Sequence, residues 1–397
     1  MIKIYDKSQC CGCKGCESVC PRHCIDMKTD EEGFWYPCVN TESCSKCGIC
    51  EMVCPALHSR EEKSKILATY AAVTNDEQIR RRSSSGGIFY EFSKNVLMRS
   101  GVVYGCAMSN DCLKAEHIRV DSVDQILLLC GSKYLQSDIS NIFNKVKHDL
   151  REGRQVLFSG TPCQVAGLKR TLIGTQTDKL ITVDFICHGV PSPEVWRQYA
   201  FTLEQKEKSL LSAVSFRDKT DGWHNYSLKC VFENGREYRS NVTNNLYLRG
   251  FVMNDFLRPS CYYCKFKGDS HCSDITMADF WGVEDILPNV ADDRGTSLAL
   301  VHTDAGLKLL ECLSEKITLL QVETEDGLKQ NPSYYESVLR RKVRDVYFKS
   351  FATNPSKILE EFCGLSVRTK VIRKICACID KVCCMRQNFI QKVGKNR

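Results

Sequence analysis

Two cysteine runs near the start of the chain contain the residues best suited to chemistry. Each run has the spacing C-x2-C-x2-C-x3-C followed by proline, once at residues 10–21 and again at residues 44–55. Thiolates are soft ligands for iron and zinc, and this spacing is typical of proteins that bind 4Fe-4S clusters. The expected metal ligands are Cys10, Cys13, Cys16, Cys20, Cys44, Cys47, Cys50 and Cys54.

The order of these ligands predicts how two clusters share them. In two-cluster ferredoxins, the fourth cysteine of each run binds the cluster of the other run. We therefore expect Cys54 to complete the first site and Cys20 to complete the second. Zinc usually takes two separate C-x2-C pairs, and disulfides belong to exported proteins, so both alternatives are disfavoured. The remaining cysteines of this region are expected to pack near the clusters without binding them, namely Cys11, Cys24 and Cys38.

Composition sets limits on the compartment. The chain has 397 residues and 26 cysteines, of which 11 precede residue 60. The first residues lack the apolar core and cleavage site of an export signal, and no apolar run approaches the roughly 20 residues that span a bilayer. A reducing, cytoplasmic compartment and no transmembrane segment are therefore expected.

The net charge of +7 resides almost entirely in the C-terminal tail. From Arg368 to Arg397, nine lysines or arginines stand against one acidic residue, a charge of +8 for this segment. Charge confined to a tail predicts no nucleic-acid partner. We expect the chain over residues 351–397 to be a peripheral, basic helical tail. Its residues 371–397 are amphipathic, and we expect them either to form a loosely docked surface helix or to lie on an anionic membrane surface or an acidic protein. Its cysteines are Cys376, Cys378, Cys383 and Cys384.

The segment between these ends alternates strand-like and helix-like patterns, which is typical of an α/β or α+β fold. Asn234-Gly235 predicts the turn of a hairpin over residues 226–238. A second α/β portion is expected to begin at Asp274. Strands are expected at 66–73, 101–107, 155–159, 180–185, 211–216 and 297–301, and helices at 87–98, 137–150, 164–172, 193–205 and 305–313.

Two turns in this segment have the form of ligand-binding loops. Residues 80–88 place arginines, serines and two glycines before a helical pattern, so backbone N–H groups are available to a phosphate. A serine-rich helix cap after a solvated basic run is an interpretation of equal weight. Residues 156–167 indicate a strand, a tight turn and a helix start, where ligands of α/β sheets collect. Cys163 lies in the first turn of that helix, where the dipole favours the thiolate.

Other cysteines predict a further metal site. Cys187 follows the next strand, and Cys261 and Cys264 form a single C-x2-C pair. One such pair is ambiguous among a zinc site, a redox dithiol and half of a cluster. Together with Cys163, these thiols would complete a third 4Fe-4S site, in which Cys272 competes for one position.

Several motifs in this segment occur in an order that resembles the coenzyme F-420 hydrogenase/dehydrogenase beta-subunit family, preceded here by a ferredoxin domain. The motifs are SSSGG, VLFSGTPCQVAGLK, VDFICHGVPSPEVW, SFRDKTDGW, RPSCYYCKFKG and SDITMADFWG. The resemblance implies Cys163, Cys187, Cys261 and Cys264 as cluster ligands in preference to Cys272. The expected domains are a two-cluster ferredoxin-like domain at 1–60, a larger α/β flavin and iron–sulfur domain with a mixed sheet at 66–350, divided near residue 150, and the helical tail.

The resemblance further implies an enzyme, an iron–sulfur flavoprotein oxidoreductase that contains FAD. Such a protein moves electrons between ferredoxin-type clusters and a two-electron carrier, such as the deazaflavin F-420, or an organic substrate. Its partners would be a redox protein such as ferredoxin and the small-molecule carrier, with a homo-oligomer left open. The alternative is an electron-transfer subunit that relays electrons from ferredoxin to a separate catalytic partner without substrate chemistry of its own.

Within this family resemblance, FAD is expected to lie across the 83–87 loop and the 160–164 turn, with its pyrophosphate on backbone N–H groups. His188 is expected either to donate a proton near the flavin or to cap the turn that follows it. The expected cofactor contacts are Ser84, Ser85, Gly86, Gly87, Ser159, Gly160, Thr161, Pro162, Gln164 and Gly189.

Two further groups of side chains have alternative interpretations. Trp223 and Trp281 are expected to stack on a flavin or substrate ring or, more commonly, to pack in the core. Four cations are expected to line a site for an acidic substrate or cofactor phosphate, or to form a solvated surface, which is the favoured alternative for Lys219. These cations are Arg217, Lys219, Lys265 and Lys267.

Overall fold

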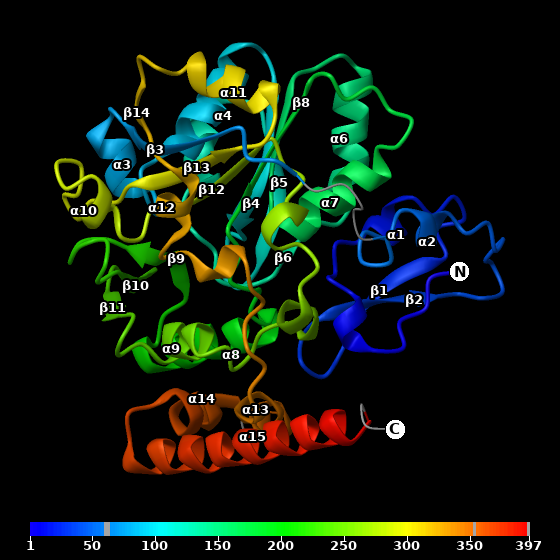
Figure 1. Cartoon of the computed structure of the whole chain (residues 1–397), viewed down its shortest axis with the longest axis vertical. Coiled ribbons are helices and arrows are strands. Elements are labelled where there is room, and N and C mark those ends of the chain that lie inside the picture. The colour runs from blue at the N-terminus through cyan, green and yellow to red at the C-terminus, as the bar shows by residue number, and fades with distance from the viewer. Residues whose placement is uncertain (59–63, 352–354, 395–397) are drawn as a thin grey trace.

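The computed structural model of the chain describes residues 1–58, 64–351 and 355–394, with side chains at 357–380 in the last of these ranges. The N-terminal residues form a small module at one side of a larger α/β body (Figure 1). The C-terminal helices form a layer along another side of the same body. The body therefore contacts both the N-terminal module and the C-terminal helices.

The N-terminal module consists of a two-stranded antiparallel sheet and two very short helices. Each helix begins after a residue in the left-handed region, Lys14 at φ 58° and Gly48 at φ 78°. These turns fold the chain back on itself, so that cysteines of both runs share one interior with Ile2 and Ile25. The elements are α1 (Gly15–Ser18), β1 (Ile25–Thr29), β2 (Trp35–Val39) and α2 (Ile49–Met52).

Within the described residues, a nine-stranded mixed sheet forms the centre of the body, in the order β14-β3-β13-β12-β8-β7-β4-β5-β6. The strands β12, β8, β7 and β4 run parallel, and antiparallel neighbours flank them on both sides. Parallel strands covered on both faces are continuously apolar, as Val156, Leu157 and Phe158 of β7 illustrate. The strands are β3 (Ala68–Thr74), β4 (Val102–Met108), β5 (Ala115–Val120), β6 (Ser137–Asp138), β7 (Val156–Ser159), β8 (Leu180–Phe185), β12 (Ile275–Asp279), β13 (Ser297–Val301) and β14 (Ile317–Gln321).

Helices cover both faces of this sheet. On one face, Phe92 of α4 belongs to one apolar cluster with Val103 of β4 and Leu157 of β7. On the other, Phe143 of α6 belongs to a second cluster with Phe158 of β7, because successive strand residues point to opposite faces. The covering and connecting helices are α3 (Glu77–Arg82), α4 (Ile88–Met98), α5 (Ile126–Leu129), α6 (Ile142–Arg151), α7 (Pro162–Thr171), α10 (Val283–Ile286), α11 (Asp304–Glu311) and α12 (Thr324–Leu328).

A smaller antiparallel sheet, in the order β11-β10-β9, lies beside a third apolar layer. The predicted hairpin is confirmed, with Gly235 at φ 78° in its turn. Trp196 of α8, Tyr247 of α9 and Tyr347 of α13 are fully buried in one cluster beneath this sheet. The elements of this part are α8 (Pro193–Glu207), β9 (Leu211–Asp218), β10 (Ser227–Phe232), β11 (Glu237–Asn241), α9 (Leu246–Val252) and α13 (Lys342–Phe351).

The predicted strands and helices are present, but two predictions about the body differ from the structure. The helix expected at 137–150 begins only at Ile142, because residues 137–138 form β6 beside β5. The segment after Asp274 does not form a second α/β portion. Its strands β12 and β13 lie between β8 and β3 in the same sheet, because their apolar residues complete that sheet's centre. The expected division near residue 150 does not coincide with any break in the sheet.

The C-terminal residues are docked more firmly than expected. Ile358, Phe362 and Cys363 of α14 (Pro355–Cys363) are buried in the layer that contains α8 and α9, so the prediction of a peripheral tail is wrong for this helix. The last helix, α15 (Val367–Gly394), packs against it through Cys376. Among the described residues, no helix is both long enough and apolar enough to cross a bilayer. The predicted tail cysteines Cys383 and Cys384 lie outside the described side chains.

Candidate functional site

A cavity of about 490 Å³ opens at the carboxyl ends of β7 and β8. His188 and most of the predicted cofactor contacts lie on its wall. Gly86 does not line this cavity, because it packs against Ala72 and Ser297. Pro162 lines a smaller neighbouring cavity. The predicted contacts that line the large cavity are Ser84, Ser85, Gly87, Ser159, Gly160, Thr161, Gln164 and Gly189.

The turn between β7 and α7 is fixed by a capping box. Thr161 is the N-cap of α7, and its backbone N–H donates to Gln164 Oε1 at 2.9 Å. Pro162 occupies the first helical position, where the missing N–H costs nothing. Because the strand ends at Ser159 and the helix begins at Pro162, the helix N-terminus opens directly on the cavity.

The serine loop at residues 83–87 is pressed against the edge of two strands. Gly86 N–H donates to Ser297 Oγ at 2.9 Å, and Gly86 O accepts from Thr74 N at 2.7 Å. A side chain at this position would lie 2.3 Å from Ala72 O, so only glycine allows this approach. Gly87, at φ 84°, then starts α4. The loop is therefore held in place by β3 and β13 and not by its own sequence alone.

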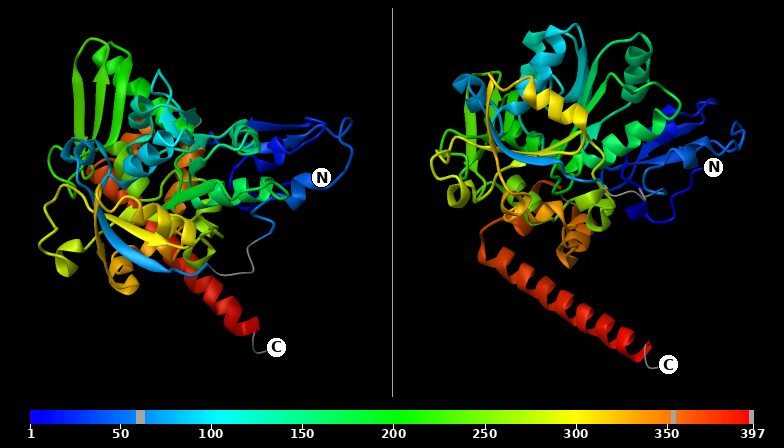
Figure 2. Two further views of the ribbon diagram at one scale, coloured as in Figure 1. Left: turned by 90° about the horizontal axis from the view of Figure 1, so that it is seen from above. Right: turned by 45° about the horizontal axis from the view of Figure 1, so that its top comes forward.

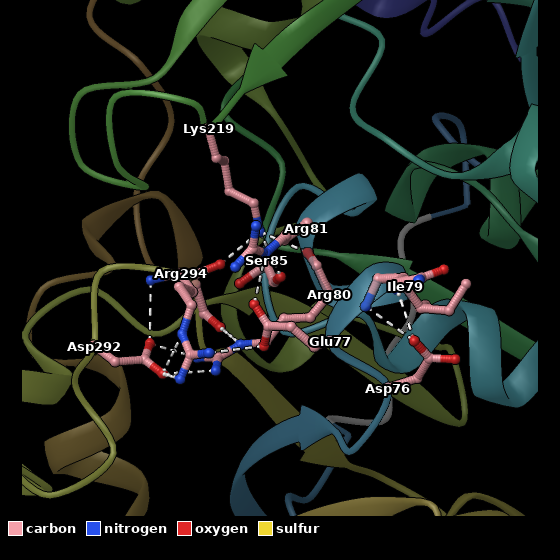
Figure 3. Close-up of polar contacts among 11 residues, drawn as sticks. Asp76, Glu77, Ile79, Arg80, Arg81, Ser85, Lys219, Asp292 and Arg294 are labelled. Atoms are coloured by element: carbon pink, nitrogen blue, oxygen red, sulfur yellow. Dashed lines mark hydrogen bonds and ion pairs between the residues drawn. The ribbon is translucent and has the colours of Figure 1, made fainter.

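Lys219 also stabilises the serine loop, through hydrogen bonds to backbone carbonyls (Figure 3). Its Nζ donates to three backbone carbonyls, those of Arg80 at 2.9 Å, Ser85 at 3.0 Å and Arg294 at 2.6 Å. Burial, together with the guanidinium groups of Arg217 and Arg80, lowers the pKa of Lys219 to about 7. The prediction of a solvated lysine is therefore wrong, because the sequence does not reveal that three carbonyls converge on it.

A second cavity, of about 40 Å³, gathers the cysteines of the predicted third metal site. Cys163 comes from the first turn of α7, Cys187 from the end of β8, and Cys261 and Cys264 from the turn around Pro259–Tyr263. Cys11 of the N-terminal module completes the cysteine lining. The competitor Cys272 packs instead in the apolar cluster beneath α6 and α7.

The cysteines that line this second cavity are half-buried. Burial raises the pKa of Cys261 to about 12 and the pKa of Cys187 well above its ordinary value. The neighbouring Cys11 thiol and burial likewise raise the pKa of Cys163. The hydrogen bond with Cys11 and burial therefore act against the effect of the helix dipole that the sequence predicts at Cys163. Ionisation of these thiols requires a compensating cation, which is the chemistry of a metal-binding cysteine set.

The module's cysteines group in the crosswise manner that shared clusters require. Burial, followed by the charges of Cys10 and Cys54, raises the pKa of Cys16, which shows that these thiols of the first group lie near one another. Cys24, expected only to pack, lies with the second group, its Sγ 3.4 Å from Cys20 Sγ. The second group lines a small cavity and consists of Cys20, Cys44, Cys47 and Cys50.

No three Cys, His, Asp or Glu side chains converge on one point among the residues that the structure describes. A 4Fe-4S cluster is bound at separate corners, so its ligands surround a space and do not meet at a single ion. Cysteines placed around small cavities match that requirement. Backbone N–H groups also approach the sulfurs, with Ile2 N 3.2 Å from Cys50 Sγ and Val190 N 3.4 Å from Cys261 Sγ.

Arg258 joins the module to the body beside the second cavity. This fully buried guanidinium donates to Cys10 O at 2.8 Å, to Trp35 O at 3.0 Å and to Gln136 Oε1 at 3.0 Å. Gln136 in turn donates to Cys11 O at 3.2 Å. Neither Arg258 nor Gln136 is predicted from the sequence as a contact between the module and the body. The only signal was the position of Arg258 three residues before Cys261 in the RPSC motif.

His188 lies where the two cavities adjoin. It lines both of them, and its Nε2 is 2.6 Å from Asn254 Oδ1. Its ring contacts the edge of Phe251, with the centroids 5.0 Å apart. Burial lowers the pKa of His188, so the neutral imidazole predominates at neutral pH.

Arg217 and Trp281 form the wall of the large cavity opposite α7. The guanidinium pairs with Asp279 at 2.9 Å and lies over the rings of Tyr226 and Trp281, 4.1 and 5.4 Å from their centroids. Its buried Nε has no partner among the described residues. Trp223 is stacked behind Trp281 at 4.6 Å and is buried, which confirms core packing for this tryptophan.

The other predicted cations do not form a free basic surface. Lys265 Nζ donates to Ala56 O of the module at 2.7 Å. Lys267 Nζ donates to Cys187 O at 2.5 Å and to Ser333 O at 2.6 Å. Both lysines therefore position backbone around the second cavity, and the prediction of a site for an acidic substrate at these two residues is wrong.

Part of the chain matches a known protein family. Residues 153–326 match the family described as the C terminus of the beta subunit of coenzyme F420 hydrogenase/dehydrogenase. This segment belongs to that family. It contains Cys163, Cys187, Cys261 and Cys264, together with the turn that starts α7 and the Arg217 wall. The segment is shorter than the predicted resemblance over residues 66–350.

Two individual proteins are also similar to the chain. The coenzyme F420-dependent sulfite reductase of Methanocaldococcus jannaschii is 25% identical over 169 residues, which are 42% of this chain and 26% of that protein. The chain therefore spans about a quarter of the length of this curated relative. A chain of the F420-reducing [NiFe] hydrogenase complex from Methanosarcina barkeri has a TM-score of 0.48 and 14% identity, covering 78% of this chain and 97% of that one.

The large cavity also meets the requirements of a flavin nucleotide. Its volume of about 490 Å³ lies in the range of roughly 300–1,000 Å³ that is usual for cofactor clefts. The N-terminal turn of α7 lines the cavity, and the positive end of a helix dipole favours an anionic group such as a pyrophosphate. The side chains of Arg217, Tyr226 and Trp281 line the cavity as well. The residues present therefore fit FAD.

Proposed function

We propose that this chain is an iron–sulfur flavoprotein oxidoreductase with FAD in the large cavity and three 4Fe-4S clusters on its cysteine groups. One observation carries the proposal. The cysteine cavity lies between the module and the large cavity, because Ser8, Gln9 and Ala56 line one side of it while His188 and Gly189 line both cavities. A continuous path from the module to the large cavity is the arrangement that electron transfer requires.

The division of tasks follows from the residues. A bound flavin would exchange electrons in pairs with a two-electron carrier and singly with iron–sulfur clusters. The serine loop and the start of α7 would bind its pyrophosphate, and Arg217, whose side chain lines the cavity, would place a positive charge beside the bound flavin. His188 would hold a proton on its imidazole at the boundary between flavin and cluster, which retains the proposed catalytic role for this residue.

The identity of the two-electron partner is proposed from the names of the relatives. The matched family and the similar sulfite reductase both carry F420 in their names, so a deazaflavin-like carrier is the first candidate. The electron partner at the module would be a soluble redox protein such as ferredoxin in the cytoplasm. The alternative is a relay subunit that passes electrons to a separate catalytic protein. The exposed Cys47 loop of the module supports either role, because it brings one cysteine group near the surface.

Cofactor content provides the first test. Protein reconstituted anaerobically should contain about 12 iron atoms per chain, from three four-iron clusters, and one FAD. Iron and acid-labile sulfide are measured chemically, and FAD is measured by absorbance after its release. A measured content of about eight iron atoms per chain would contradict the third cluster. The absence of flavin would contradict the proposed mechanism.

A second experiment separates the enzyme from the relay. The protein is reduced with dithionite, freed of excess reductant and mixed with deazaflavin, nicotinamide or quinone acceptors. Stoichiometric reoxidation by one small molecule supports an enzyme with its own substrate site. Reoxidation only by a protein partner supports the relay.

A further inference from the structure

The outward face of α15 carries an exposed aliphatic row. Val367, Val371, Ile375 and Ile379 recur at every fourth position, with exposed fractions of 76%, 49%, 55% and 41%. Residues at this spacing lie above one another on a helix, so they form one continuous ridge. Isolated apolar residues are ordinary on protein surfaces, but a contiguous ridge marks a contact surface.

The opposite face of α15 fixes the helix to the body. Cys376 is buried there, and Arg373 pairs with the buried Asp255 and donates to Phe362 O at 2.7 Å. Asp380 accepts a hydrogen bond from the backbone N–H at the start of α13 at 3.0 Å. Figure 2 shows α15 as a rod at the margin of the molecule. Because the inner face is fixed, the aliphatic ridge cannot turn into the body.

Basic residues border the ridge. Lys370 and Lys374 are exposed beside it, and Arg368 forms only an exposed ion pair with Glu361 at 3.1 Å. From Arg368 to the end of the chain the net charge is +8, so two copies of this helix would repel each other. Charge complementarity therefore favours an anionic partner over a second copy of the chain. In the sequence, apolar residues continue at related spacing with Val382, Met385 and Phe389.

The composition of this face favours lipid over an acidic protein. Protein interfaces are enriched in aromatic residues and arginine and depleted in lysine, whereas the described ridge consists of valine and isoleucine bordered by lysine. Helices that lie in the membrane interface combine a buried aliphatic face with basic flanks. We propose that α15 docks the protein on an anionic lipid surface. Val371 and Ile375 enter the headgroup region, and Lys370 and Lys374 contact lipid phosphates.

Vesicle binding by the full-length, cofactor-loaded protein tests this proposal. Vesicles of phosphatidylcholine, with or without phosphatidylglycerol, are sedimented and the bound protein is measured. We expect at least tenfold stronger binding to the anionic vesicles and at least a tenfold loss in the double variant Val371→Gln, Ile375→Gln. Glutamine favours a helix at least as well as valine or isoleucine, so α15 should persist. The matched control is Met98→Gln in α4, which removes a 72% exposed apolar side chain elsewhere and should bind like the native protein.

Charge is tested separately from apolar insertion. Each lysine near an anionic surface strengthens binding about fivefold, so Lys370→Gln together with Lys374→Gln should weaken it roughly 25-fold. Raising the salt concentration should weaken native binding in the same direction. If circular dichroism shows that the aliphatic double variant has lost helix, the lysine double variant still tests whether α15 binds lipid.

Three outcomes would overturn the proposal. The first is equal binding of the native protein to neutral and anionic vesicles, and the second is undiminished vesicle binding by both the aliphatic and the lysine double variants. The third is a dimer in solution that the aliphatic double variant dissociates, because it would assign the ridge to contact with a second copy of the chain. Iron, flavin and turnover with soluble acceptors should be unchanged in both variants. Failure of lipid docking is therefore distinguishable from failure of the redox proposal.

Discussion

The two kinds of cysteine site in this molecule are built in different ways. In the module, eight cysteines lie in two short runs, and left-handed turns at Lys14 and Gly48 fold the two runs around one shared interior. Around the second cavity, Cys163, Cys187 and the Cys261 pair come from three separate loops of the body. The first arrangement is set largely by the local chain, the second by the order and register of β7 and β8 and by the docking of the module.

This difference teaches where each site is vulnerable. A local site should survive changes in the body, because its ligand spacing is encoded within a few residues. An assembled site should respond to any change that shifts one loop relative to another, because its ligands have no covalent constraint in common. Substitutions in the body and at its border with the module therefore test the comparison.

The largest effect is expected from Cys187→Ser. It should reduce iron from about 12 to about 8 atoms per chain, because one four-iron cluster loses a ligand while the module's clusters remain. Iron analysis and electron paramagnetic resonance of the reduced protein measure this. Cys272→Ser is the matched control and should retain all the iron, because Cys272 packs beneath α6 and α7. Full iron in Cys187→Ser would show that the third site is built from other residues.

Arg258→Gln should weaken the junction between the two regions. The change leaves buried carbonyls of Cys10 and Trp35 without a donor, and each such loss costs about 1–3 kcal/mol. We expect the free energy of unfolding to fall by about 3 kcal/mol and electron transfer from the module to slow at least tenfold. Anaerobic urea unfolding and stopped-flow reoxidation measure the two effects.

A control for that junction is provided by Arg170→Gln. Arg170 also donates from the body to the module, at Met52 O, but from an exposed position. Its loss should cost less than about 1 kcal/mol. If both arginine variants behaved alike, burial of Arg258 would not be what joins the module to the body.

Gly86→Ala tests whether the serine loop is also an assembled feature. A methyl group there would meet Ala72 O at 2.3 Å, so the loop must move away from β3. Overpacking of this kind costs about 1–3 kcal/mol, and we expect FAD affinity to fall at least tenfold. Flavin fluorescence titration gives the affinity. Gly235→Ala, in a hairpin turn with nothing near the added methyl, should cost about 1–2 kcal/mol of backbone strain and leave FAD binding unchanged.

The last effect is a pH dependence that belongs to Lys219. Its pKa is about 7 in the folded protein but about 10.4 in an unfolded chain. Between pH 7 and 10 the unfolded state therefore binds more protons, and this lysine makes the native protein more stable as pH rises. Below pH 7 both states are protonated and the contribution no longer changes. The difference in unfolding free energy between the native protein and Lys219→Met should therefore grow from pH 7 to pH 9.5, whereas parallel curves would contradict the lowered pKa.

Some features of the fold and of the candidate site could be predicted from the sequence, and others could not. The strand, turn and helix at residues 156–167 could be predicted, because an apolar run is followed by Gly160, by the cap residue Thr161 and by Pro162 at the start of the helix. Most of the predicted cofactor contacts line one cavity. The contacts of Arg258, Gln136 and Lys219 could not be predicted, because most of their partners are backbone carbonyls. Any residue supplies such a carbonyl, so these contacts leave no signal in sequence spacing.

The sequence by itself determined the chemistry of the two cysteine runs, the turn chemistry at the strand ends and the basic character of the last helix. These properties are local, so spacing and residue type express them directly. Only the tertiary structure decided that Cys11 borders the cysteines of the body, that β12 and β13 complete the central sheet and that α14 belongs to the core. Those outcomes depend on which distant apolar surfaces are buried together, and many pairings of similar segments satisfy the same local pattern.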